Sequence, residues 1–260
     1  MTKPRIWAVM ILMVGSLVVS PGAEAQPGGS APVIQPLVIE EMVHDPAAFT
    51  QGLEISRGIL YEGTGLAGAS QLRELDPVTG ELRRAVAVPG NYFAEGITVV
   101  GDRVWQLTYR DGVAVEWDAG TLTPVREAPI SGEGWGLCHD GARLIRSDGT
   151  SRLTFQNPDD LAVLGGVDVT RDGGPVRGLN ELECVDGRVW ANVWPSDTIV
   201  RIDPATGEVD LVVDAAGLRD HGIPATAQVL NGIAHVQGAE FLLTGKDWPK
   251  MFRVLLDPER

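Results

Sequence analysis

Five short stretches of this chain repeat one pattern at nearly regular intervals, and this repeat constrains the fold more than any other feature. In each stretch a variable polar or aromatic residue is followed by Gly, or once by Glu, and then by Leu or Ile. Their first residues are 51, 95, 135, 180 and 231, so the steps are 44, 40, 45 and 51. A period of this length with strong β character is typical of a β-propeller. The stretches are Gln51-Gly52-Leu53, Glu95-Gly96-Ile97, Trp135-Gly136-Leu137, Asn180-Glu181-Leu182 and Asn231-Gly232-Ile233.

Further strand signals follow each stretch and predict blades of four strands. After a second and a third apolar segment, four repeats have an Asp or Asn turn, as in Asp76-Pro77 and Asp203-Pro204. Such a side chain bonds nearby backbone while Pro fixes φ, so these dipeptides indicate tight turns. A fourth strand then completes each of these repeats. The four are predicted over residues 82–88, 125–130, 161–169 and 209–213.

The fifth repeat lacks a fourth segment after its third strand, which is predicted over residues 251–256. An apolar segment over residues 37–43 precedes the first stretch and has no other blade to join. Pairing this N-terminal strand with the last blade closes the ring and covers an open sheet edge. We therefore predict an all-β fold, a five-bladed β-propeller over residues 36–260, with a helical turn only at 214–221.

The first 25 residues have the features of a cleavable signal peptide. A basic start precedes an apolar run over residues 6–19, too short to span a bilayer comfortably, and Ala23-Glu24-Ala25 is a small-x-small cleavage site. We therefore expect cleavage before Gln26 and a periplasmic or secreted protein. Residues 26–35 are rich in Gly, Pro, Ser and Ala and are predicted to be a disordered linker.

Charge and histidine spacing bear on partners and cofactors. The formal net charge is −14, and an acidic surface repels nucleic acid and anionic lipid, so we expect neither as a partner. A propeller of this size is expected to be a monomer. The His residues show no metal-ligand spacing, so we predict no catalytic metal and no required cofactor, and leave open a structural ion in the central channel. The four are at positions 44, 139, 221 and 235.

Two cysteines, Cys138 and Cys184, would meet an oxidising environment in an exported protein. Cys138 lies three residues after Trp135, whereas Cys184 lies four after Asn180. Odd and even offsets along a strand point to opposite faces of the sheet. Matched strands of neighbouring blades would then aim the two thiols differently, so the spacing favours free thiols over a disulfide.

The five variable residues of the repeat form a candidate site. If each stretch opens the innermost strand of its blade, Gln51, Glu95, Trp135, Asn180 and Asn231 surround one opening. Residues two positions earlier lie on the same strand face and would add a mostly apolar collar with one carboxylate. These are Phe49, Phe93, Glu133, Gly178 and Val229.

Eight strings in this order resemble the plant- and bacterial-type glutaminyl-peptide cyclotransferases. The resemblance covers nearly the whole chain after the leader. It implies a five-bladed propeller that converts the N-terminal glutamine of peptides or proteins to pyroglutamate and releases ammonia. The strings are Phe49-Thr50-Gln51-Gly52, Ala94-Glu95-Gly96-Ile97-Thr98, Glu133-Gly134-Trp135-Gly136-Leu137, Ser147-Asp148-Gly149, Leu179-Asn180-Glu181-Leu182-Glu183, Ala191-Asn192-Val193-Trp194, Val229-Leu230-Asn231-Gly232-Ile233-Ala234 and Thr244-Gly245-Lys246-Asp247-Trp248-Pro249.

The resemblance also implies roles for single residues. Glu95 matches the family's catalytic acid and base. Six other matched residues line the family's pocket. Tyr109 departs from the pattern, because the family usually has Trp after Gln-Leu-Thr, and this puts substrate fit at that wall in doubt. The six are Phe49, Gln51, Trp135, Asn180, Trp194 and Lys246.

These residue types suit the cyclisation reaction. The α-amine must lose a proton and the leaving amide nitrogen must gain one, and a carboxylate between them can do both. Glu95 is predicted to be this shuttle, with its pKa raised by apolar neighbours. Lys246 or the side-chain amides of Gln51 and Asn180 can stabilise the oxyanion. Trp135 and Trp194 would hold the substrate, and Glu133 its ammonium group.

Two other readings remain open. A non-catalytic periplasmic propeller that binds peptide or sugar would keep the scaffold without the chemistry, and Tyr109 is the one feature that favours it. A metal-dependent propeller hydrolase is a weaker alternative that strict metal dependence would favour. Lys246 could instead be a solvated surface residue, and Asn180 and Asn231 could be turn or cap residues.

Overall fold

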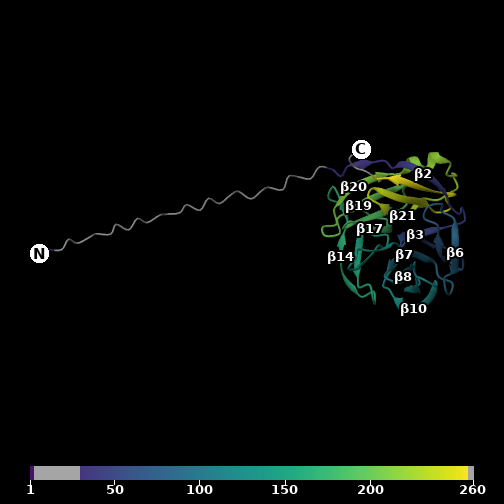
Figure 1. Ribbon diagram of the computed structural model, residues 1–260, viewed down its shortest axis with the longest axis horizontal. Helices are drawn as coiled ribbons and strands as arrows, with labels where there is room; N and C mark the ends of the chain where they lie inside the picture. Colours follow the sequence, from purple (N-terminus) through teal and green to yellow (C-terminus); the bar gives the residue numbers. More distant parts are fainter. Residues whose placement is uncertain (3–29, 257–260) are drawn as a thin grey trace.

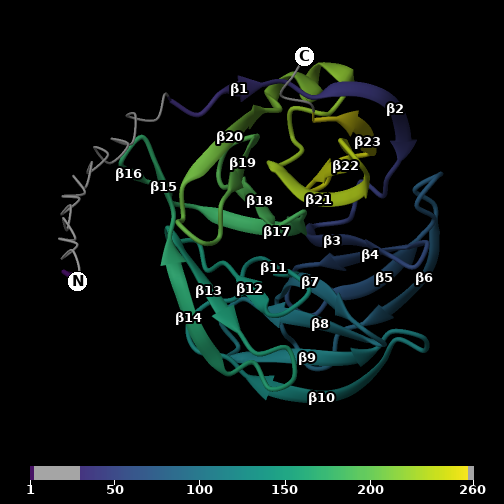
Figure 2. The ribbon, with the colours of Figure 1, turned by 60° about the vertical axis from the view of Figure 1, so that its left-hand side comes forward.

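In the computed structural model, residues 1–2 and 30–256 are described, and five antiparallel sheets are arranged as a ring around a central axis (Figures 1 and 2). The prediction of a five-bladed β-propeller is confirmed. Residues 3–29, which contain all but the first two residues of the predicted signal peptide and the first part of the linker, lie outside the described residues. Within the described ranges, no helix is both long and apolar enough to cross a membrane.

Each blade is built on four antiparallel strands, and within blades 1 to 4 these pair in sequence order. Blade 1 contains β3 (Thr50–Ser56), β4 (Ile59–Thr64), β5 (Gln71–Leu75) and β6 (Leu82–Ala87). Blade 2 contains β7 (Ala94–Val100), β8 (Arg103–Thr108), β9 (Val113–Asp118) and β10 (Thr123–Pro129). Blade 3 contains β11 (Leu137–His139), β12 (Leu144–Arg146), β13 (Arg152–Gln156) and β14 (Val163–Asp168).

The last two blades include strands from the N-terminal part of the chain. Blade 4 contains β17 (Leu179–Val185), β18 (Arg188–Val193), β19 (Thr198–Ile202) and β20 (Val209–Asp214). Blade 5 contains β21 (Leu230–Gln237), β22 (Glu240–Gly245), β23 (Lys250–Leu255) and β2 (Leu37–Val43). A small hairpin of β15 (Thr170–Arg171) and β16 (Gly174–Pro175) and the 3-10 helix η1 (Ala216–His221) lie between blades.

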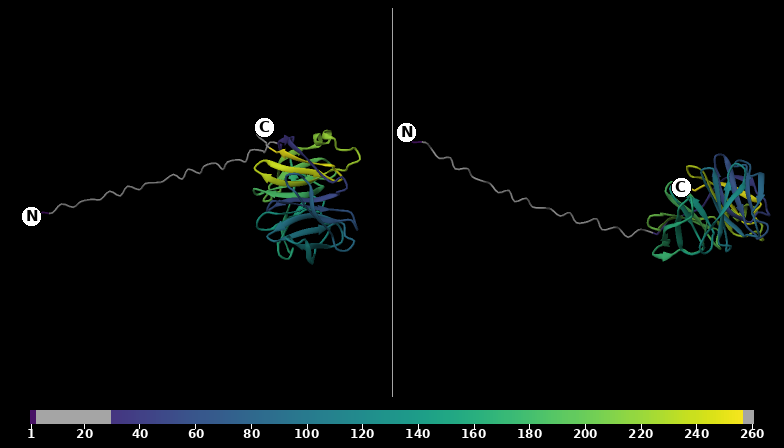
Figure 3. Two further views of the ribbon diagram at one scale, coloured as in Figure 1. Left: turned by 45° about the vertical axis from the view of Figure 1, so that its right-hand side comes forward. Right: turned by 90° about the horizontal axis from the view of Figure 1, so that it is seen from below.

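The ring is closed by antiparallel pairing of the N-terminal strand β2 with β23, as the sequence predicts. Strands β2 and β23 lie side by side in Figure 2, and the purple and yellow strands are adjacent in the left view of Figure 3. The predicted disordered linker is wrong in its second half. Strand β1 (Val33–Ile34) pairs in parallel with β20 and adds a fifth strand to blade 4, because the edge of β20 offers free backbone groups.

The core consists of apolar layers between neighbouring blades rather than one central cluster. One layer joins blades 3 and 4 and includes Cys138, Ile145, Leu182 and Val200. Comparable clusters fill the other four interfaces of the ring. Each sheet therefore buries both faces, one against each neighbour, and the middle strands are mostly buried.

The repeated glycine allows the innermost strands to approach one another. A Cβ on Gly96 would lie 2.6 Å from the Trp135 carbonyl oxygen, to which the Gly96 N–H donates a hydrogen bond of 2.7 Å. Blade 4 has Glu181 at this position. Its carboxylate accepts hydrogen bonds from Leu53 N at 3.2 Å and Ile233 N at 2.9 Å, and so links blade 4 to blades 1 and 5.

Cys138 and Cys184 form a disulfide, with their Cα atoms 5.5 Å apart, so the prediction of free thiols is wrong. The two faces of a blade pack against different neighbours. Leu137 packs in the layer toward blade 2 and Cys138 in the layer toward blade 4, while Cys184 packs toward blade 3 and Val185 toward blade 5. Two thiols at odd and even positions of equivalent strands in adjacent blades therefore face each other.

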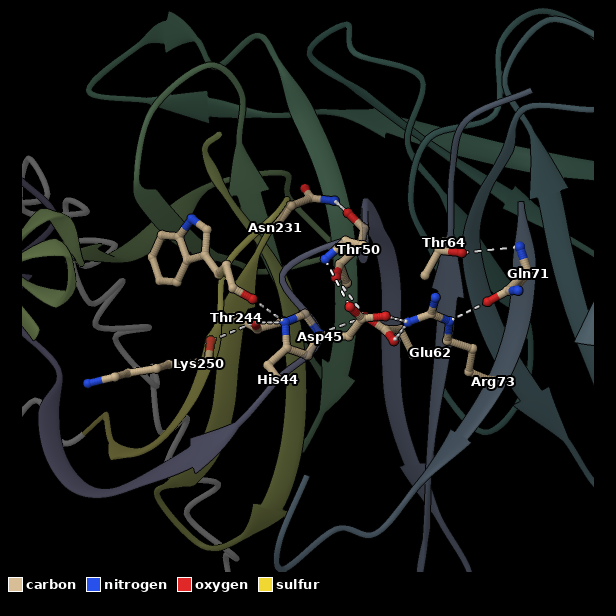
Figure 4. A network of polar contacts seen from close by, with 12 residues as sticks. His44, Asp45, Thr50, Glu62, Thr64, Gln71, Arg73, Asn231, Thr244 and Lys250 are labelled. Carbon is tan, nitrogen blue, oxygen red and sulfur yellow. Dashed lines mark hydrogen bonds and ion pairs between the residues drawn. The ribbon is translucent and has the colours of Figure 1, made fainter. Parts of the chain in front are cut away.

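A buried polar network joins the closing strand to blade 1 (Figure 4). His44, just after β2, donates to the Trp248 carbonyl at 2.7 Å and contacts the Glu62 carboxylate at 2.9 Å. Glu62 also accepts a hydrogen bond from Thr50 at 2.7 Å and lies 3.6 Å from Arg73. We call His44, Glu62, Thr50 and Arg73 the seam network.

Candidate active site

A pocket of about 380 Å³ opens at the end of the ring where the innermost strands begin. Its residues come from two parts of the blades, the start of the first strand and the turn after the second strand. Antiparallel pairing brings these two parts to the same edge of the sheet. The lining residues are Phe49, Gln51, Phe93, Glu95, Tyr109, Arg110, Glu133, Trp135, Asn180, Trp194, Gln228 and Lys246.

A β-bulge at the variable position turns the pocket residues inward. In β7 the pairing shifts between Ala94 and Ile97, so Glu95 and Gly96 together oppose one residue of β8. The same shift occurs at Asn180 in β17 and at Asn231 in β21. Bulges re-aim side chains at functional sites, so the repeat encodes both the close approach of the strands and the direction of the variable side chain.

Glu95 and Lys246 are buried charged residues without a direct partner. They are 4% and 6% exposed, and neither makes a hydrogen bond or ion pair with another described side chain. Burial raises the pKa of Glu95 well above 4.5, while the attraction of Lys246 opposes this shift and the charge of Glu133 adds to it. Burial likewise lowers the pKa of Lys246 from 10.5, against the attraction of Glu95 and Asp247.

Two side-chain amides also reach the pocket. Asn231 Nδ2 donates to the Thr50 carbonyl at 3.0 Å and to Gln51 Oε1 at 3.1 Å. Because a carbonyl only accepts, this arrangement fixes both amides and leaves the Gln51 NH₂ group as the part available to a ligand. Asn180 has a buried Oδ1 with no hydrogen-bond partner among the described residues.

Aromatic rings form a continuous arc along the pocket wall. Ring centroids are 6.0 Å apart for Phe49 and Phe93, 5.8 Å for Phe93 and Tyr109, 6.3 Å for Tyr109 and Trp135, and 5.8 Å for Trp135 and Trp194. Three of the four contacts are edge-on, the geometry that ring quadrupoles favour. Trp194 is 47% exposed, so the arc runs from the pocket interior to its mouth.

Glu133 has both carboxylate oxygens engaged. Oε2 accepts a hydrogen bond from Trp135 Nε1 at 3.0 Å, and Oε1 accepts one from Arg110 Nε at 2.7 Å. Burial raises the pKa of Glu133, but the bonds from Trp135 and Arg110 lower it more, so the net shift is downward from 4.5. The residue is therefore held as an anion that fixes the Trp135 ring.

Nine of the ten predicted site residues line this pocket. Asn231 is the exception, because it is fully buried beneath Gln51 and acts on the pocket through it. The predicted collar is correct for three blades, but Gly178 and Val229 do not line the pocket. Sequence reasoning missed Arg110 and Gln228, which lie outside the strict alternation, although Arg110 directly follows Tyr109.

The described residues do not include any group of three or more His, Cys, Asp or Glu side chains that could hold a metal ion. The pocket residues offer an isolated carboxylate, an ammonium group and amides. Such a donor set suits proton transfer and stabilisation of an anion.

Comparison with known proteins gives the family of this chain. The glutamine cyclotransferase family matches residues 8–256. The chain is 39% identical over 228 residues to a glutaminyl-peptide cyclotransferase of Arabidopsis thaliana, covering 84% of this chain and 70% of that protein. The crystal structure of Myxococcus xanthus glutaminyl cyclase superimposes with a TM-score of 0.80 at 38% identity, covering 87% of this chain and all of that one.

The fold and pocket thus define a five-bladed propeller enzyme with a buried carboxylate at its centre. This chain belongs to the glutamine cyclotransferase family, as the sequence resemblance predicts.

Proposed function

We propose that this protein converts the N-terminal glutamine of peptides and proteins to pyroglutamate with release of ammonia, and that Glu95 is its proton shuttle. The observation that carries this proposal is the buried Glu95 carboxyl, whose pKa is raised well above 4.5 in a pocket lined by aromatic rings. A carboxyl with such a pKa can both accept and return a proton near neutral pH.

The reaction needs few groups because the nucleophile is part of the substrate. The α-amine is tethered to the γ-carboxamide, so a bent, bound conformer supplies much of the entropic advantage. Glu95 takes one proton from the amine as the nitrogen attacks the γ-carbon, and the carbonyl oxygen becomes an oxyanion. Glu95 then gives that proton to the amide nitrogen, the C–N bond breaks and ammonia leaves.

Lys246 and the two amides stabilise the oxyanion. The Lys246 ammonium lies 5.0 Å from the centre of the Phe49 ring and has no carboxylate partner among the described residues, so its charge is available to a ligand. Gln51 is oriented by Asn231 to offer its NH₂ group. Donors in a buried, preorganised pocket are worth more than in water because they need no reorganisation during the reaction.

Trp135 and Trp194 hold the substrate and exclude water. The ring of Trp135 is fixed by its bond to Glu133, and Trp194 lies at the mouth with one edge toward it. Glu133 acts mainly through Trp135, because both of its oxygens already accept hydrogen bonds. A direct contact of Glu133 with the substrate's ammonium would add to this role.

The cellular setting belongs to the same proposal. Cleavage of the leader before Gln26 would deliver the enzyme as a periplasmic or secreted monomer. Its disulfide, Cys138–Cys184, suits an oxidising compartment. Mass spectrometry of the exported protein and its elution on size exclusion would check both expectations.

The decisive test is ammonia release from purified protein and peptides that begin with glutamine, in the presence of EDTA. We expect turnover in EDTA and formation of the pyroglutamyl peptide. Glu95→Gln should lower kcat by about 10²–10⁴, the range for a general acid and base, without unfolding. No ammonia from any such peptide would favour the non-catalytic binding propeller, and strict metal dependence would favour a hydrolase.

A further inference from the structure

Arg110 is the most exposed charged residue of the pocket and is not needed for the chemistry described above. Its side chain is 67% exposed, against 31% for Glu133, and Glu95 and Lys246 are buried at the pocket floor. A peptide whose first residue reaches that floor must leave through the mouth. Its second residue therefore passes the mouth residues Arg110, Glu133, Trp194 and Gln228.

The guanidinium of Arg110 is fixed in place but only partly used. Its Nε donates to Glu133 Oε1 at 2.7 Å, and its carbon lies 4.4 Å from the centre of the Tyr109 ring. The two terminal NH₂ groups have no partner among the described residues. A planar, preorganised guanidinium with two free donor groups matches the two oxygens of a carboxylate.

Neighbouring carboxylates do not occupy these donors. Glu133 is already shared between Arg110 Nε and Trp135, as described above. Asp111, the next residue in the chain, accepts a hydrogen bond from Phe93 N at 3.2 Å. The mouth therefore offers free guanidinium donors for an anion, whereas both oxygens of Glu133 already accept hydrogen bonds.

We propose that Arg110 makes the enzyme favour substrates with a carboxylate on the residue after the N-terminal glutamine, an inference that rests on the proposed function. The net charge of −14 acts the other way over longer distances, since it repels acidic peptides. A preference for acidic substrates would thus have to come from a local contact. Because the contact is exposed, its free energy is small and decreases as salt is added.

The test compares kcat/KM for three C-terminally amidated peptides, Gln-Glu-Ala, Gln-Gln-Ala and Gln-Lys-Ala, at low and high salt. At low salt we expect kcat/KM to be about fivefold higher for Gln-Glu-Ala than for Gln-Gln-Ala, and lowest for Gln-Lys-Ala. Arg110→Gln should make kcat/KM equal for Gln-Glu-Ala and Gln-Gln-Ala, and Arg110→Lys should retain part of the difference. Arg110→Glu should make Gln-Lys-Ala the preferred peptide. Gln-Ala as free acid and as amide shows whether a terminal carboxylate is read at the same place.

Arg57→Gln is the matched control. Arg57 is also 67% exposed and paired with one acidic residue, Asp102, but it follows the far end of β3 and does not line the pocket. It should keep the full substrate ratio. Equal turnover of all three peptides by the unaltered enzyme, or loss of the ratio in Arg57→Gln, would overturn this inference alone. Absence of turnover with every peptide would overturn the proposed function as well.

Discussion

Two buried charged pairs lie in neighbouring parts of this propeller and behave in opposite ways. In the seam network, His44 and Glu62 are in contact at 2.9 Å and each has further hydrogen bonds. In the pocket, Glu95 and Lys246 share no direct contact. All four side chains are almost wholly buried, so burial alone does not explain the difference.

The pKa shifts show what the partners change. Burial lowers the pKa of His44, but the charge and hydrogen bond of Glu62 raise it more, and the net pKa is above 6.5. Burial raises the pKa of Glu62, but His44 and Arg73 lower it to a net value below 4.5. Direct pairing thus keeps the seam charged. Glu95 and Lys246 keep the pKa shifts that burial causes, because neither has a direct partner that reverses them. An acid and base that works near neutral pH requires such a shifted pKa.

Removing one charge from the seam should cost the most stability. Glu62→Gln removes the counter-charge of the buried His44 and leaves Arg73 with only Asp45, at 3.0 Å, so we expect a loss of about 3–5 kcal/mol in the free energy of unfolding. Turnover of the folded protein should fall far less than in Glu95→Gln. Urea denaturation with assays well below the unfolding midpoint measures both.

Asp102→Asn is the control for this change. It removes the exposed pair with Arg57 and should cost no more than about 1 kcal/mol. If Glu62→Gln were as stable as this control, the contrast between the two buried pairs would lose its basis.

Removing the pocket cation should have the opposite effect, with a large loss of turnover and no loss of stability. Lys246→Met deletes a buried ammonium without a partner, so we expect kcat to fall by about 10²–10³ with stability unchanged or increased. Lys250→Met, in the same blade, removes an exposed pair with Glu41 at 2.6 Å and should leave kcat unchanged. Steady-state kinetics and thermal unfolding of the two variants compare them directly. A clear loss of stability in Lys246→Met would contradict the assignment.

Lowering the pH should affect the two pairs differently, with activity lost before stability. The contribution of His44 to stability is complete below pH 6.5 and is lost as pH rises through its raised pKa; that of Glu62 is present above pH 4.5 and is lost as pH falls through its lowered pKa. The seam is therefore at full strength between pH 4.5 and 6.5. Glu95, whose pKa lies well above 4.5, gains its proton on the way down, so kcat should fall as pH falls before stability does.

The pH profile of kcat/KM, which reports the free enzyme and the free substrate, identifies the group that titrates. Lys246 opposes the upward shift in the pKa of Glu95, so Lys246→Met should move the acid limb of kcat/KM to higher pH. The α-amine of the free substrate has the same pKa with either protein, so it would not respond to this substitution. An acid limb that stays in place would mean that Glu95 does not set it.

Much of the architecture was readable from the sequence because repetition is a local property. The repeat predicts five blades, and the unpaired strand before the first repeat predicts closure through β2 and β23. Nine of the ten predicted site residues lie in one pocket, and eight of these nine belong to the family strings. The cysteines show where a local pattern fails, since alternation describes one strand and a disulfide depends on which face meets the next blade.

By itself, then, the sequence determined the number of blades, the position of closure and the residue types around the opening, since all three follow from spacing along one chain. Only the tertiary structure decided that Asn231 acts beneath Gln51, that Cys138 meets Cys184, and that Arg110 reaches the pocket mouth. It also decided that His44 and Glu62 touch while Glu95 and Lys246 do not. The physical reason is that pKa and reactivity depend on distances between blades, and no spacing along the chain fixes those distances.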